Sequence, residues 1–145
     1  EKKCVTTASG QVHTYDYLVI ATGSSAFVPP ISGKEKKGVF VYRTIEDLDA
    51  IMDYAETIKS REGASATVIG GGLLGLEAAK ATMDMGLKSH VVEFADRLMP
   101  RQLDERGAAV LKNTLTDLGL GIHCKKNTAQ IGGNGSITHL PLIHI

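Results

Sequence analysis

The chain has 145 residues, with 16 Lys and Arg against 16 Asp and Glu, so its formal net charge is zero. This balance argues against nucleic acid or an anionic membrane as a partner, because proteins that bind them usually carry a basic excess. Hydrophobic residues make up 43% of the chain, near the globular average, and no apolar run approaches the ~20 residues that span a bilayer. The two cysteines, Cys4 and Cys124, form no CxxC or zinc pattern, which excludes a disulfide scaffold and fits a cytoplasmic location.

The first part of the chain predicts short strands. Residues 2–7 and 11–15 are expected to be two strands around the turn signal Ser9-Gly10. The continuous apolar run at 15–21 is typical of a strand buried on both faces of a parallel sheet. It ends at a glycine turn, and the residues alone leave open whether that turn binds a ligand. A brief strand is also predicted at 39–42.

The middle of the chain predicts alternating strands and helices. Thr44 is expected to cap a helix whose apolar side chains recur every three or four residues, and Gly63 closes that element. Strands are then expected at 66–69, 90–94 and 122–124, separated by helices at 76–85 and 103–118. This order predicts an α/β fold with a Rossmann-like parallel sheet.

The last part of the chain is harder to interpret. Residues 131–137 predict a hairpin, because Asn134-Gly135 supplies the positive φ angles of a tight turn. Residues 140–145 fit no strand of the predicted sheet and no natural stop. The chain also begins with Glu1 rather than Met. We therefore expect it to be an internal piece of a longer protein.

The strongest functional signal is Gly70-x-Gly72-x-x-Gly75, since a predicted strand precedes it and a helix begins at it. Such a turn binds a dinucleotide pyrophosphate, because Gly72 permits close backbone approach and the helix start offers free N–H groups. A glycine-rich turn without a ligand is the alternative. The expected phosphate contacts are Gly70, Gly71, Gly72, Leu73, Leu74 and Gly75.

An acid, Glu93, ends the next predicted strand 18 residues after Gly75. In a dinucleotide fold this acid accepts hydrogen bonds from the adenosine ribose, and its charge disfavours the 2′-phosphate of NADPH. NADH is therefore the expected cofactor. Arg97 and Arg101 follow closely; they either offset that repulsion or are ordinary surface cations.

Two segments, YDYLVIATGSSAFVPPISG (15–33) and ATVIGGGLLGLEAA (66–79), resemble the FAD- and NAD-binding two-dinucleotide-fold flavoproteins of the pyridine nucleotide-disulfide oxidoreductase superfamily. The stretches GVFVYRTIEDLDAI (38–51) and RLMPRQLD (97–104) are similar to the large subunits of NAD(P)H-dependent assimilatory nitrite reductases. Ferredoxin and rubredoxin reductases are close relatives. The resemblance implies a partial FAD-binding domain at 1–37 and an NAD-binding domain, truncated at its C-terminus, at 38–145.

The resemblance also implies further cofactor contacts. Ala21, Thr22 and Gly23 match the segment that contacts FAD, and Arg43 matches an arginine that touches it; a helix-start cation is the alternative for Arg43. Glu77 matches a glutamate near the nicotinamide, and its alternative is a solvated helical residue. The upstream and downstream FAD motifs of the family, and the cysteines for its iron–sulfur cluster and sirohaem, are not in this sequence.

The expected function is thus NAD(P)H binding and hydride transfer to FAD, feeding nitrite reduction to ammonia in a parent flavoprotein, with the isolated piece inactive. The parent is a candidate homodimer. The alternatives are a ferredoxin or rubredoxin reductase, and a dinucleotide-binding module without turnover. His123, Cys124, His139 and His144 match no zinc spacing, and no residue is assigned as a catalytic acid or base.

Overall fold

The structure, a computed structural model, describes residues 3–144. It begins with an antiparallel hairpin of β1 (Cys4–Thr6) and β2 (Val12–Thr14), in which Val5 lies opposite His13. The turn closes with the Thr7 N–H donating to the Gln11 carbonyl at 2.9 Å. The two predicted N-terminal strands are therefore confirmed.

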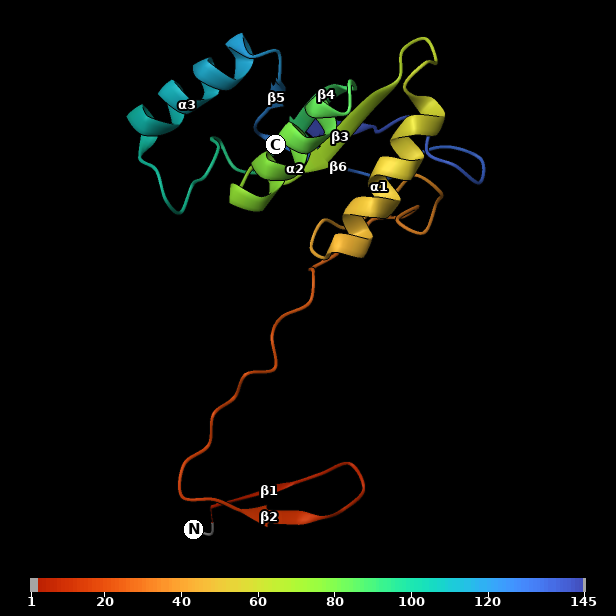
Figure 1. The fold of residues 1–145 in the computed structure, drawn as a ribbon. Helices are drawn as coiled ribbons and strands as arrows, with labels where there is room; N and C mark the ends of the chain where they lie inside the picture. The colour runs from red at the N-terminus through yellow and green to blue at the C-terminus, as the bar shows by residue number, and fades with distance from the viewer. Residues whose placement is uncertain (1–2, 145) are drawn as a thin grey trace.

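The predicted buried strand at 15–21 is wrong. These residues form no strand, and Tyr17 and Val19 are 93% and 84% exposed. Figure 1 shows them in an extended segment that joins the hairpin to the remaining elements. The physical reason is that no described strand lies beside them, so their backbone groups have no ladder and their apolar side chains no layer to pack on.

The predicted parallel sheet is confirmed. It consists of β3 (Ser65–Ile69), β4 (Lys88–Val92) and β5 (Gly121–His123), which lie side by side in that order. Helix α2 (Leu73–Asp84) connects β3 to β4, and α3 (Glu105–Asp117) connects β4 to β5. The α/β fold therefore follows the β-α-β-α-β order of the sequence.

One face of this sheet carries the core. Successive residues of a strand point to opposite faces, so Ser89 and Val91 of β4 share one face. Their side chains are 1% and 0% exposed. Val91 packs with Ala79 of α2 and with other buried apolar residues, namely Leu98 and Leu120. The Ser89 hydroxyl is satisfied by the Thr82 hydroxyl of α2 at 2.8 Å.

Helix α1 (Ile45–Ile58) is capped by Thr44, as predicted. The Thr44 hydroxyl accepts from the Asp47 N–H at 3.2 Å, and the Asp47 carboxylate accepts from the Thr44 N–H at 3.0 Å. The helix ends at Ile58, before a turn that includes Gly63. The strand predicted just before it, at 39–42, is wrong: these residues form no strand, and the Val39 N–H donates to the Lys36 carbonyl at 3.2 Å, closing a turn just before them.

The C-terminal part forms a second small sheet, which the sequence did not predict. Strand β6 (Lys126–Thr128) pairs antiparallel with β7 (Leu142–His144), so residues 142–144 do form a strand, outside the parallel sheet; residue 145 lies outside the described range. The predicted hairpin is wider than expected, closing between Gly132 and His139. Positive φ angles fall on Gly133 and Gly135 rather than on an Asn-Gly pair.

Two single bridges join residues far apart in the sequence. Ser32 pairs with Gln130, and Lys37 pairs with Ser136. The segment before α1 is thereby held against the segment between β6 and β7. Within residues 3–144, no helix is both long and apolar enough to cross a membrane.

Candidate dinucleotide-binding site

The glycine turn lies between the end of β3 and the start of α2. The Gly70 N–H donates to the Val92 carbonyl at 2.8 Å, which continues the β3–β4 pairing into the turn. Gly70 has φ +115°, a conformation that side chains rarely allow. The prediction that glycine is needed here for a tight strand-to-helix turn is therefore confirmed.

The start of α2 differs from the starts of the other two helices. Thr44 caps α1 and Asp104 caps α3 with a side-chain oxygen, whereas α2 begins at Gly72 with no side-chain cap and no acid in its first turn. The N–H groups of a first helical turn have no intrahelical acceptor and lie at the positive end of the helix dipole. Leu73 and Leu74 in this turn are 57% and 58% exposed. The helix start is thus accessible to an anion.

The three motif glycines have different surroundings. A Cβ on Gly75 would overlap the Gly70 carbonyl oxygen, so glycine is required there for helix–strand packing. A Cβ on Gly72 would meet nothing within 4 Å. Space is therefore free at Gly72, on the residue that was predicted to admit a pyrophosphate.

Glu93 lies directly beside this turn. One carboxylate oxygen accepts from the Gly71 N–H at 2.5 Å, and the other accepts from the Ala95 N–H at 2.7 Å. The Glu93 backbone is held as well, since its N–H donates to the His123 carbonyl at 2.9 Å. The acid that follows β4 is thus fixed at the edge of the turn. The sequence predicted that this acid accepts hydrogen bonds from the adenosine ribose.

Two further residues of the loop after β4 also contact the turn. The Met99 N–H donates to the Gly71 carbonyl at 2.9 Å, and Leu98, at 1% exposure, packs against Gly71. Sequence reasoning missed these two residues. Met99 has φ +47°, and no residue-type signal predicts that a methionine adopts this left-handed conformation.

Other predicted contacts are not brought to the turn. Ala21, Thr22 and Gly23 are exposed in the extended segment, and Arg43 is exposed immediately before α1. Glu77 is exposed on α2, in the helix that begins at the turn. The roles of these residues stay predictions.

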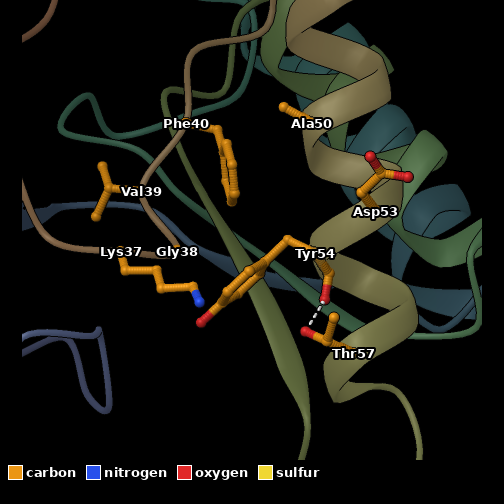
Figure 2. A pocket seen from close by; sticks show the side chains of 8 residues that line it. All are labelled: Lys37, Gly38, Val39, Phe40, Ala50, Asp53, Tyr54 and Thr57. Atoms are coloured by element: carbon orange, nitrogen blue, oxygen red, sulfur yellow. Dashed lines mark hydrogen bonds between the residues drawn. The ribbon is translucent and has the colours of Figure 1, made fainter.

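A surface groove lies elsewhere, away from the glycine turn. It has a volume of about 370 Å³ and lies between the 37–40 segment and α1. Figure 2 shows the rings of Phe40 and Tyr54 next to each other in it, with centroids 5.4 Å apart. None of the predicted cofactor contacts lines this groove, so we do not assign it to the dinucleotide.

A histidine pair lies on the parallel sheet. His90 Nδ1 of β4 and His123 Nε2 of β5 are 3.2 Å apart, and a Cβ on Gly121 would overlap the His90 ring. Among residues 3–144, no three His, Cys, Asp or Glu side chains form a cluster that could hold a metal ion. Burial lowers the pKa of His90 below 6.5, and the nearby His123 and Lys88 lower it further.

We expect His90 to make the stability depend on pH. The pKa of His90 is lower in the folded chain, so the unfolded chain takes up the proton first as the pH falls. The free energy of unfolding should therefore be highest above pH 6.5, and it should decrease as the pH falls from there through the folded-state pKa. Urea unfolding at about pH 7.5 and about pH 5.5 would measure the loss, which His90→Gln should reduce. His13→Gln, which replaces an exposed histidine on β2, is the control. An unchanged pH dependence in His90→Gln would contradict the assignment.

Comparison with known proteins identifies the family. The family model for pyridine nucleotide-disulphide oxidoreductases matches residues 1–143. The chain is 51% identical over 134 residues to the nitrite reductase [NAD(P)H] large subunit of Klebsiella oxytoca, covering 92% of this chain and 14% of that protein.

Solved structures agree with this match. A NAD-dependent persulfide reductase from A. fulgidus superposes with a TM-score of 0.80 at 29% identity, over 96% of this chain and 25% of that one. A FAD-dependent oxidoreductase from Desulfovibrio vulgaris gives 0.70 at 29% identity, over 93% and 34%. The chain belongs to the pyridine nucleotide-disulphide oxidoreductase family, of whose larger members it spans only a part.

Proposed function

We propose that residues 70–75 and Glu93 bind NAD(P)H, with NADH preferred. The supporting observation is the accessible start of α2, which has no side-chain cap and has free space at Gly72. The pyrophosphate would lie on the N–H groups of Gly72, Leu73 and Leu74, where the helix dipole favours negative charge. Glu93, already fixed beside Gly71, would accept from the ribose 2′-hydroxyl.

We further propose that the larger protein containing this chain oxidises NADH through FAD and reduces nitrite to ammonia. This rests on the family, on the Klebsiella relative, and on the FAD-dependent oxidoreductase among the similar structures. Bound NAD(P)H supplies the hydride. We assign residues 1–37 to the FAD-binding domain and 38–145 to the NAD-binding domain of that protein. A cytoplasmic location and a homodimeric assembly are candidate properties of that protein.

The described residues do not by themselves form a site for FAD. The candidate contacts Ala21, Thr22 and Gly23 are exposed, and they line neither the groove beside α1 nor the groove beside Arg97. Further flavin contacts, in addition to Ala21, Thr22, Gly23 and Arg43, are assigned to other parts of the parent protein, and so are the iron–sulfur cluster and the sirohaem. No reaction step is assigned to residues of this chain beyond binding and orienting the dinucleotide.

We expect NADH to bind the isolated chain and Gly72→Val to abolish the binding. A side chain at this position meets the phosphates rather than the protein, so affinity should fall by at least about tenfold. Isothermal titration with NADH tests this directly, and circular dichroism checks that the variant is folded. Equal affinity in wild type and variant would refute the assignment of this turn.

FAD should not remain bound to the isolated chain. The Ala21–Gly23 segment offers exposed backbone groups and one hydroxyl, that of Thr22, but no charged group. Three charge-assisted hydrogen bonds from other segments, at roughly 1.5–3 kcal/mol each, would correspond to about three or more decades of affinity. The measurement is the visible spectrum after adding excess FAD and desalting. A stoichiometric flavin band in the protein fraction would show that the candidate contacts suffice.

A further inference from the structure

The loop that follows β4 contacts the glycine turn at two places. At its start, the Glu93 carboxylate accepts from the Gly71 N–H at 2.5 Å. Further along, the Met99 N–H donates to the Gly71 carbonyl at 2.9 Å, and Leu98 packs on Gly71. Residues 94–98 therefore run along the rim of the turn, next to the acid that we assign to the ribose.

Arg97 is the cation in this part of the loop, and its guanidinium is directed to its own loop. Nη1 lies 3.0 Å from the Asp96 carboxylate, while Nε and Nη2 donate to the Leu103 and Pro100 carbonyls at 3.4 and 3.5 Å. The two carbonyl contacts are long and weak, so the ion pair with Asp96 is the principal restraint. Arg101, four residues on, makes no such contact with any described residue.

The exposure of the pair bears on whether a ligand reaches it. The side chains of Arg97 and Asp96 are 31% and 48% exposed, so the pair lies at the surface and is held only weakly. A phosphate group on the ribose 2′ position would be a stronger partner for a guanidinium than a single carboxylate. To reach the Arg97 guanidinium, this phosphate would have to replace the Asp96 carboxylate as its partner. It would also be repelled by two nearby carboxylates, those of Asp96 and Glu93.

We propose that Asp96 determines cofactor specificity by positioning Arg97. While Asp96 holds the guanidinium, Arg97 is withheld from a 2′-phosphate, and NADH is preferred over NADPH. Without Asp96, Arg97 swings to the ribose and binds that phosphate. This inference rests on the proposed dinucleotide site, and it adds to Glu93 a second specificity residue that acts through a neighbour.

The test is the affinity of the full chain for NADPH and NADH in Asp96→Asn. We expect NADPH to bind about three- to fivefold more tightly than in wild type and NADH to change by less than about twofold. In the Arg97→Ala background the same Asp96→Asn change should alter NADPH binding by less than about twofold, because the cation that it would release is absent. Thermal unfolding of each variant verifies that the fold is kept.

The matched control is Glu105→Gln. Glu105 lines the same groove of about 210 Å³ as Asp96 and Arg97, so this change removes an equal charge nearby and leaves the ion pair intact. An equal gain in NADPH affinity in Glu105→Gln, or a gain from Asp96→Asn that persists without Arg97, would overturn the inference and indicate general charge repulsion. If wild type binds neither nucleotide, the proposed function itself fails. If wild type binds NADH and Asp96→Asn leaves the NADPH affinity unchanged, only the role of Asp96 fails.

Discussion

Replacing Gly75 by alanine should destabilise the fold by about 3 kcal/mol, whereas Gly72→Ala should cost at most about 1 kcal/mol. The new methyl group at Gly75 would overlap the Gly70 carbonyl oxygen, a backbone atom that the turn holds in place. At Gly72 the backbone has φ −82° and ψ −177°, which alanine adopts without strain, and no atom lies within 4 Å of the new methyl group.

Urea unfolding followed by far-ultraviolet circular dichroism measures both effects. Among variants that fold, NADH affinity should fall more in Gly72→Ala than in Gly75→Ala. The reason is that Gly72 faces the expected phosphates, whereas Gly75 faces the protein. Equal losses of stability at the two positions would contradict the packing described for this turn. A stable Gly75→Ala variant would show that α2 can move away from β3 at little cost.

Replacing Glu93 by arginine should shift the ratio of NADPH to NADH affinity by about 100-fold toward NADPH. The change removes the carboxylate that would accept from the ribose hydroxyl and places a cation where a 2′-phosphate would lie. It also removes the acceptor of the Gly71 and Ala95 N–H groups, so some loss of NADH affinity from a looser turn is expected as well.

Two further variants separate these causes. Glu93→Gln keeps one oxygen acceptor and removes the charge, so it should weaken NADH binding without producing a preference for NADPH. Glu62→Arg reverses an exposed charge outside the site and should leave the ratio unchanged. If wild type already prefers NADPH severalfold, Glu93 does not control the choice of cofactor.

The sequence by itself determined the β-α-β-α-β order, the cap of α1 and the position of the glycine turn. These features depend on residues close together in the chain. Thr44 and Asp47 are three positions apart and satisfy each other's backbone groups, and Gly70 and Gly75 belong to one strand-to-helix connection. Local patterns of this kind can be predicted from the sequence, because the residues that interact in the fold are also close together in the chain.

The tertiary structure alone decided which distant groups meet. The apolar run at 15–21 has a strand pattern but no neighbouring strand, so burial depended on a partner that its own residues do not reveal. Met99, whose backbone is left-handed, donates its N–H to the carbonyl of Gly71, which lies 28 positions earlier in the chain. Glu93 was predicted to bind the ribose because it follows β4. Its hydrogen bond with the Gly71 N–H, however, forms because β3 and β4 are neighbours in the sheet. Spacing along the chain predicts elements, whereas contacts between them follow from packing in three dimensions.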